Sequence, residues 1–422
     1  MKMKRQQNRS GMGGMVVAAM VGLLPLAHAR LSHAQVMVSA RASSDGPGEA
    51  PISKKSLERY AEVLGLDVTQ KEDAAALYEG YAAQHRTASE AMRRGMREAS
   101  SEFSDSQDFQ EFQKLMKKTM DAYRVEGERL EKEFFGDLRQ VISSEQDERW
   151  DRLERLRRRE KGLRFGSLSG ERIDLTDVLR GMKVDASKVE GLDDALLQYE
   201  IDLDRALVER AKVMEAMAAG DQGEGIISIP DPAVMQERME KMREAGAKIR
   251  DVNERHTRVI QAMLGEGESA RLTEEVRRRS FPQVYRRTHA QRVLDAAAGM
   301  ADLSSDQKRR LEEVREAYER EARGVNDRWI DAIAKSEEEG GDGAFMLGGG
   351  QVLRMSMGGD DSGPVADARK ARRDTDKKLR ERVESLLTPE QRAKLPEPGV
   401  EREEMMLEDG ASFVTESVII QR

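Results

Sequence analysis

The feature that most constrains the fold of this chain is a five-residue signature that occurs six times, in three pairs. Its clearest copy is Leu387-Thr388-Pro389-Glu390-Gln391. The other copies start at Leu66, Ile142, Val184, Leu264 and Leu303. Copies that open a pair lie 118 or 119 residues apart, and copies that close a pair lie 122 or 123 residues apart. A fixed period of this kind indicates a chain built from repeated units, here three.

A tyrosine supports the same register. It lies eleven residues after the last position of each opening copy, as Tyr81, Tyr199 and Tyr318. The chain has only 7 tyrosines in 422 residues, so agreement by chance at all three positions is rare. The repeat therefore extends beyond the signature itself.

The signature predicts the start of a helix. Its second residue (Thr, Ser or Asp) can accept a hydrogen bond from a free backbone N–H, and the Gln three residues later can bond back to the N–H of that cap. Pro389 suits the first helical position, and Glu390 suits the positive end of the helix dipole. The residues predicted to carry this structural helix-cap role are Leu66, Gln70, Ile142, Ser143, Gln146, Leu303, Ser304, Gln307, Leu387, Thr388 and Gln391. The middle repeat departs from the pattern, since Lys188 and Glu268 replace the glutamines and Gly265 is a weaker cap.

Between the signatures, apolar residues recur at steps of three and four, as at Phe112, Met116, Met120 and Tyr123. This spacing is typical of amphipathic helices. Each repeat is interrupted near its middle by helix-poor sequence, at 100–108, 220–232 and 340–364. Two helices joined by a short connection form an antiparallel hairpin. We therefore predict an all-α fold with three tandem repeats of a long antiparallel helical hairpin, each with short capped flanking helices.

The predicted boundaries follow from the repeat. Residues 54–165, 170–281 and 285–396 are the three repeats, 35–53 a flexible linker, and 397–422 a flexible acidic tail. Hydrophobic residues make up 38% of the chain and charged residues 36%, against about 45–50% and about 25% in an average globular domain. Long helices with narrow apolar stripes need no more hydrophobic residues than this.

The first 34 residues predict an export signal. Lys2, Lys4, Arg5 and Arg9 precede an apolar stretch, and small residues suit cleavage after Ala29 or Ala34. Gly13, Gly14 and Pro25 weaken the stretch as a spanning helix, although an uncleaved anchor stays an alternative. The expected location is periplasmic or secreted, with no integral membrane span in the mature chain. The chain has no cysteine, which excludes a lipid attached through cysteine and any disulfide.

Charge argues against a nucleic-acid partner. Without residues 1–29 the chain keeps 67 of its 71 basic residues and all 79 acidic ones, a net charge of −12. Two arginine runs, at 157–159 and 277–279, follow closing signatures. We expect them to line exposed helix faces and to pair with nearby carboxylates. The alternative is a basic site for an anionic lipid, polymer or peptide.

The sequence contains no pattern typical of a catalytic, cofactor or metal site. HExxH, GxGxxG and GxxxxGK motifs are missing, and the nearest match to a nucleophile elbow, at 166–170, has Leu168 where serine is needed. His256 lies on an apolar helical stripe and is expected to be a core residue. We therefore predict no enzyme, no catalytic residues and no cofactor.

Methionine is enriched, with 23 residues. Met92 and Met96 share one predicted helix, and Met235, Met239 and Met242 share another. Methionine fills helix seams, and it also lines adaptable surfaces that bind many partners. Thioethers can ligate Cu(I) as well. All three interpretations stay open, with core packing favoured.

The signature in a charged, cysteine-free helical chain with an export signal resembles the LTxxQ family of Spy/CpxP-like periplasmic proteins. The resemblance is carried by Leu387 to Gln391 and by Leu303 to Gln307. It implies an all-α fold, often a cradle-shaped dimer, and a role as an ATP-independent chaperone, envelope-stress modulator or metal-responsive sensor. This chain departs from the family in having three hairpins and an acidic mature form.

The expected function is therefore that of an exported, non-enzymatic helical binding protein whose partners are proteins, either unfolded clients or envelope components. The alternative is a structural or scaffolding repeat protein of the cell envelope, and a metal-responsive sensor is a weaker third hypothesis. The oligomeric state stays open.

Overall fold

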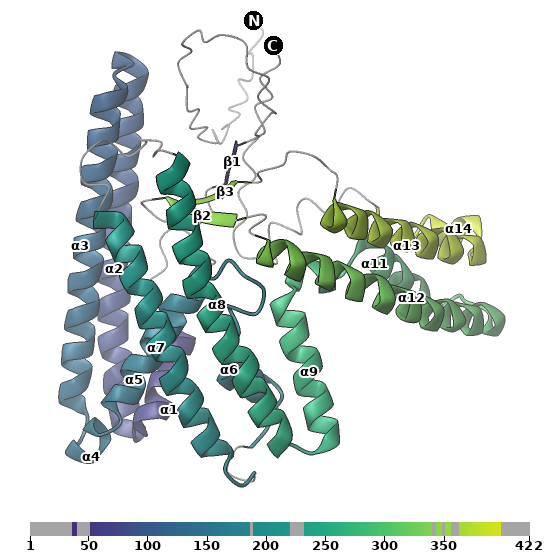
Figure 1. Ribbon diagram of the computed structural model, residues 1–422, viewed down its shortest axis with the longest axis horizontal. Helices are drawn as coiled ribbons and strands as arrows, with labels where there is room; N and C mark the ends of the chain where they lie inside the picture. Colours follow the sequence, from purple (N-terminus) through teal and green to yellow (C-terminus); the bar gives the residue numbers. More distant parts are fainter. Residues whose placement is uncertain are drawn as a thin grey trace, which may run out of the picture.

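The computed structural model describes residues 36–39, 51–185, 189–219, 232–339, 343–347, 351–355 and 363–397. In these ranges the chain is almost entirely helical, which confirms the predicted all-α class (Figure 1). The predicted signal peptide, most of the predicted linker and nearly all of the predicted acidic tail lie outside the described residues. So does the end of the signature copy that starts at Val184.

The first repeat begins with a short helix, α1 (Lys54–Leu64), followed by the long helices α2 (Val68–Ser106) and α3 (Phe109–Val141). We call the α2–α3 pair hairpin 1. The sequence predicted its break at 100–108, but α2 continues to Ser106. The hydroxyls of Ser104 and Ser106 donate to backbone carbonyls four residues earlier, which is compatible with a helix, and only two residues remain for the turn.

The second and third repeats follow the same order. In the second, α6 (Leu175–Gly181) precedes hairpin 2, which consists of α7 (Leu192–Ala219) and α8 (Pro232–Met263). In the third, α11 (His289–Ala298) precedes hairpin 3, which consists of α12 (Ser305–Glu338) and α13 (Pro364–Leu386). The connecting elements are α4 (Ser144–Asp147), α5 (Trp150–Gly162), η1 (Leu163–Phe165), α9 (Glu266–Ser280), α10 (Pro282–Tyr285) and α14 (Pro389–Arg392). In Figure 1 hairpins 1 and 2 stand upright, and hairpin 3 extends to the right.

Three short strands accompany the helices. They are β1 (Val36–Ser39), β2 (Gly343–Leu347) and β3 (Gln351–Met355), and they pair antiparallel in the order β1-β3-β2. Val36 and Gly343 both lie opposite Met355. The sequence suggested flexible segments here. Strands of four or five residues are weak local signals, and β1 in addition has its hydrogen-bond partner, β3, far along the chain.

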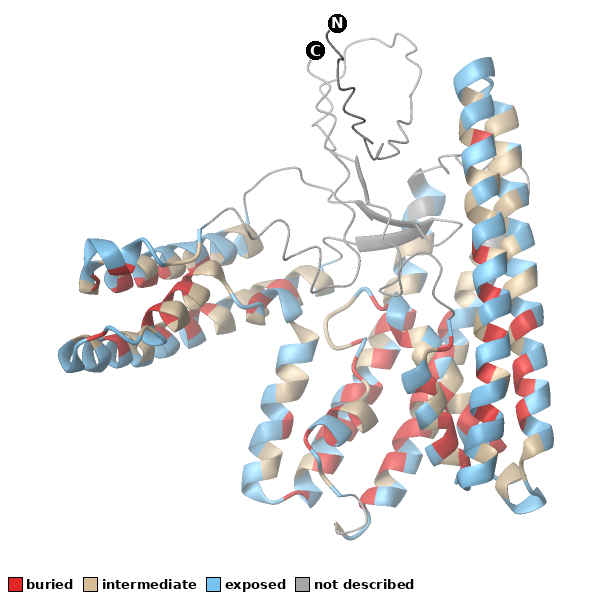
Figure 2. Ribbon diagram, turned by 180° about the vertical axis from the view of Figure 1, so that it is seen from behind, coloured by how far each residue is buried: buried red, intermediate tan, exposed pale blue. Residues whose placement is uncertain are grey.

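Each repeat has its own apolar cluster. The first gathers around Leu64, Leu138 and Leu153, the second around Leu175, Leu203 and Ile260, and the third around Ala297, Leu311 and Val383. Figure 2 shows buried residues concentrated in the lower half of hairpin 1 and in the second repeat. The far half of hairpin 1 is mostly exposed or half-buried.

The register tyrosines explain how each short helix is held. All three side chains are buried, and each contacts the start of the short helix of its own repeat. Tyr81 bonds with the backbone of Ile52, Tyr199 donates to the carbonyl of Ile173, and Tyr318 bonds with the side chain of Thr288. These three partners lie at the N-cap of α1, α6 or α11, or directly before it.

The first two repeats are joined by close packing. Helix α5 packs on α7, and a Cβ atom at Gly162 would lie 2.8 Å from a methyl carbon of Leu207, so only glycine allows this approach. Arg159, 5% exposed, pairs with Asp174 at 2.8 Å. Among the described residues, no helix is both long and apolar enough to cross a membrane.

Replacing Tyr199 with Phe tests the tyrosine contact. The Tyr199 hydroxyl accepts from Leu175 N at 3.1 Å and contacts Asn253 Oδ1 at 3.0 Å, with no exposure to water. We expect Tyr199→Phe to lower the free energy of unfolding by about 1–3 kcal/mol, since buried partners lose their bond. Chemical denaturation, monitored by circular dichroism, measures this loss in the free energy of unfolding. Tyr285→Phe, at a more exposed site, is the control, and equal losses in both variants would contradict the assignment.

Candidate functional site

The signature residues meet at the base of hairpin 1. Asp67 and Ser143 accept from the backbone N–H of Gln70 and Gln146, and each glutamine Oε1 accepts from the N–H of its own cap residue. Both copies therefore form a capping box. Leu66 is buried and Ile142 packs against the same cluster, so the first residue of each copy anchors it to the core.

The two glutamines of hairpin 1 also bond with each other. Nε2 of Gln70 lies 2.8 Å from Oε1 of Gln146, and Nε2 of Gln146 lies 2.8 Å from Oε1 of Gln70. The second N–H of Gln70 donates to the carbonyl of Val141, and that of Gln146 donates to the carbonyl of Gly65. Each amide thus uses both its donors and both its acceptor positions. The pair fastens the first turn of α2 to the end of α3.

Hairpin 3 repeats most of this geometry. Ser304 and Thr388 cap the helices, and Gln307 and Gln391 close both boxes. Nε2 of Gln307 donates to Oε1 of Gln391 at 2.9 Å and to the carbonyl of Leu386, while Nε2 of Gln391 donates to the carbonyl of Asp302. Leu303 and Leu387 are buried in the third cluster. Each signature copy therefore starts a helix and also bonds with the second copy of its own hairpin.

The middle repeat differs. Helix α9 starts after Gly265 without any side-chain cap. A capping box that was not predicted from the sequence lies in the third repeat, at Thr288 and Gln291 at the start of α11. Its Thr-x-x-Gln spacing is the signal that could have revealed it. It has no leucine in front and no glutamine partner among the described contacts.

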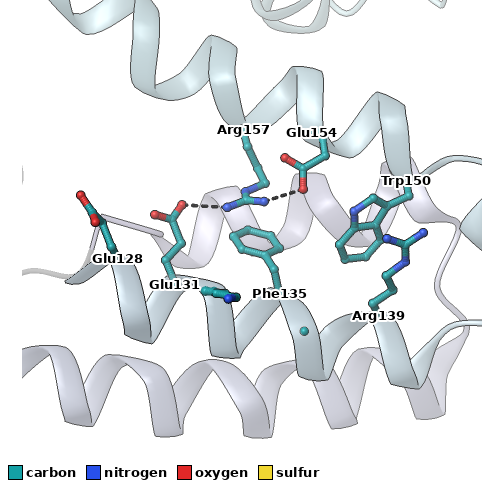
Figure 3. A pocket seen from close by; sticks show the side chains of 9 residues that line it. Glu128, Glu131, Phe135, Arg139, Trp150, Glu154 and Arg157 are labelled. Carbon is teal, nitrogen blue, oxygen red and sulfur yellow. Dashed lines mark hydrogen bonds and ion pairs between the residues drawn. The ribbon is translucent and has the colours of Figure 1, made fainter. Parts of the chain in front are cut away.

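A surface cleft of about 370 Å³ lies between α3 and α5 (Figure 3). Its lining includes Gly136 and the aromatic residues Phe135 and Trp150, which are 4% and 8% exposed. The guanidinium of Arg157 lies 3.3 Å from the centre of the Phe135 ring, and that of Arg139 lies 5.0 Å from the centre of the Trp150 ring. The remaining lining residues are Glu128, Glu131, Lys132 and Glu154.

The arginine run at 157–159 is paired as expected but is less exposed than expected. Arg157 bridges Glu131 and Glu154, and Figure 3 shows both bonds. Arg158 pairs with Asp204, and the side chain of Arg159 is buried. This run therefore fixes α5 between α3 and α7. Charge alone could not distinguish such an interface from a solvated face.

His85 and His256 are core residues. Burial lowers the pKa of His85, whose Nε2 lies 3.1 Å from the hydroxyl of Tyr123. His256 is 5% exposed and its Nε2 lies 3.0 Å from Asp202. In the part of the chain that the structure describes, no cluster of three or more His, Asp or Glu side chains could hold a metal ion.

The joint between the second and third repeats is polar. Glu337, near the end of α12, accepts from the N–H and hydroxyl of Ser169, and its carboxylate lies 3.6 Å from Arg250. Nearby, a fully buried ion pair joins Glu171 to Arg210. Burial, together with the negative charge of Glu171, raises the pKa of Glu337 above its ordinary value near 4.5.

A comparison with protein-family models matches no family, and comparisons with curated proteins and with solved structures find no match. What this chain does is therefore inferred from its own residues.

Gln391→Ala tests the glutamine pair. It leaves the N–H of Thr388 and the amide of Gln307 without their partner at a site that is 4% exposed. We expect a loss of about 1–3 kcal/mol in the free energy of unfolding. Gln291→Ala removes a capping box without a paired glutamine and should cost less. A double-mutant cycle of Gln307 and Gln391 should give a coupling of at least about 0.5 kcal/mol, and additive losses would exclude the pair.

Glu337→Gln tests the joint. Because the pKa of Glu337 is raised in the folded state, its contribution is fully present below the unfolded value and is lost as pH rises through the folded value. A glutamine keeps an acceptor for Ser169 and never ionises. We therefore expect the variant to gain melting temperature, relative to the native chain, as pH rises from about 4 to about 8. Glu338→Gln is the neighbouring control. A difference independent of pH would contradict the assignment.

Proposed function

We propose that this chain is an exported, non-enzymatic binding protein that holds apolar segments of other proteins and keeps them from aggregating, as ATP-independent periplasmic chaperones do. The observation that carries the proposal is the far half of hairpin 1, which we call the arm and define as residues 86–124. The first apolar cluster does not extend into it, because its outermost members on α2 and α3 are Tyr81 and Leu130.

The apolar seam of the arm is not buried by the rest of the chain that the structure describes. Within the arm, only Ser89 and Ala99 are buried. The apolar side chains between the helices are half-buried or exposed: Met92, Met96, Phe103, Phe109, Phe112, Leu115, Met116 and Met120. Two helices alone leave one side of such a seam open, and among the described elements α2 and α3 pack extensively only on each other and on α1. Accessible apolar surface of this kind is typical of interaction sites.

The residue types in the seam suit varied partners. Four of the eight are methionines, whose flexible thioether chains adapt to different shapes. The three phenylalanines gather at the turn, with ring centres 5.2 to 6.3 Å apart. Phe109 is 39% exposed. Charged residues around the seam would keep a complex with a bound client in solution.

A scaffolding role is the second candidate. It is favoured by the way hairpin 3 projects away from the other two hairpins, so that distant surfaces of one chain could contact different components (Figure 1). Such a protein would bind one defined partner in a fixed ratio. It would not bind unfolded clients in general.

The test is suppression of aggregation. The mature chain, from Gln35, should slow aggregation of a chemically unfolded model protein at equimolar amounts. The double variant Met96→Gln, Met116→Gln should lose most of this effect, since both side chains lie in the open seam. Met263→Gln, at a methionine of hairpin 2 that is 38% exposed, is the matched control. Circular dichroism checks that all variants stay helical.

Failure of the mature chain to slow aggregation would exclude the holding function. If the arm variant and the control suppressed aggregation equally, the arm would not be the site that holds clients. Stoichiometric capture of a single partner without general client binding would favour the scaffold.

A further inference from the structure

The cleft and the arm lie along one stripe of α3. Residues three or four apart on a helix share a face, and the cleft residues Phe135, Lys132 and Glu128 continue in such steps through Arg124 and Asp121 to Lys117. The contacts of α5 with α3 lie near the base of hairpin 1, at Glu131, Phe135 and Arg139. From Glu128 towards the turn of hairpin 1, the residues of the stripe are exposed. A surface therefore runs from the cleft on to the arm.

Two segments of the arm carry a concentrated positive charge, although the whole arm holds eight basic and seven acidic residues, because residues 98–112 at its turn add five carboxylates and no cation. Segments 86–97 and 113–124 hold eight basic and two acidic residues, a local net charge of +6 in a chain whose net charge is −8. The two segments are neighbours, because Gly95 of α2 faces Thr119 of α3. We call them the basic belt. They also hold four methionines of the open seam.

Several belt cations lack an ion partner. Arg94, Arg97, Lys117 and Lys118 are exposed, and none forms an ion pair with any other residue that the structure describes. By contrast, every arginine of the 157–159 run is paired. Unpaired like charges at this density repel one another. An acidic partner would relieve that repulsion.

The cleft can receive one apolar side chain. Its volume of about 370 Å³ is at the small end of the range for ligand sites, and the edges of Phe135 and Trp150 are its aromatic lining. The lining charges balance, with three carboxylates against three cations. At Gly136 an added Cβ would meet no other atom within 4 Å, so the cleft is open above this residue.

We infer that this surface binds an acidic segment of a partner protein, with one aromatic or large aliphatic side chain of that segment in the cleft and its carboxylates along the basic belt. The inference rests on the proposed binding function and names the chemical class of the segment. A protein segment fits better than a lipid surface. The exposed stripe of α3 between the cleft and Lys114 offers only Val125 as a large apolar residue, too little for insertion into a membrane.

Fluorescence anisotropy with labelled synthetic peptides tests this inference. The mature chain should bind a short glutamate-rich peptide with a single tryptophan. It should bind the tryptophan-to-alanine version at least about tenfold more weakly, since buried aromatic anchors dominate such contacts. A lysine-rich version should not bind. Affinity should fall with salt, because exposed charges are screened.

Two pairs of variants locate the site. Gly136→Trp fills the cleft and should weaken binding of the acidic peptide at least about tenfold, whereas Gly80→Trp is the same change at another open position of hairpin 1. Lys117→Glu with Lys118→Glu should weaken binding and reduce its salt dependence. Lys212→Glu, at an exposed lysine of hairpin 2, should do neither.

The outcomes separate this inference from the proposed function. Equal binding of the acidic and basic peptides, or full binding by Gly136→Trp, would overturn the inference while leaving aggregation suppression untouched. Binding to vesicles of anionic lipid but not to the acidic peptide would overturn it in favour of a membrane surface. Loss of peptide binding in both site variants, with both controls unchanged, would support it even if no unfolded client were protected.

Discussion

The pairing of two glutamines at the base of a hairpin is the interaction on which the architecture depends. A long two-helix hairpin has its turn at one end and is free to splay at the other. In hairpins 1 and 3 the free end is fastened by Gln70 with Gln146 and by Gln307 with Gln391. Each glutamine also closes the capping box of its own helix. One side chain thereby sets where a helix begins and which helix end lies beside it.

Fastening at the base leaves the far end of hairpin 1 without cover. The buried cluster and the arginine-rich α5 hold only the half near the glutamines. The arm therefore exposes an apolar seam beside the basic belt, in which Arg94, Arg97, Lys117 and Lys118 have no ion partner among the described residues. This contrast between a fixed base and an open arm is the physical basis of the proposed binding role. The polar contacts of Glu337 and Arg250 give hairpin 3 a different kind of attachment, without a large apolar interface.

Much of the fold could be predicted because its signals are local. Capping boxes depend on residues three apart, and amphipathic stripes on steps of three and four, so helix starts at Ser143, Ser304 and Thr388 follow from the sequence. The regular spacing of the three tyrosines could also be seen in the sequence, but the contacts that explain it could not. The bond of Tyr199 to the carbonyl of Ile173 joins residues 26 positions apart. The break in hairpin 1 was predicted too wide, because serines can also be accommodated within a helix.

The sequence by itself determined the helical class, the repeat and the cap residues, since each depends on neighbours along the chain. Only the tertiary structure decided that the caps meet in pairs, that Arg157 and Arg159 are interface residues, and that Phe135 and Trp150 form a cleft continuous with the basic belt. Those features join residues that are far apart in sequence. A charge or an aromatic ring acquires such a role only when packing decides which side of its helix is covered.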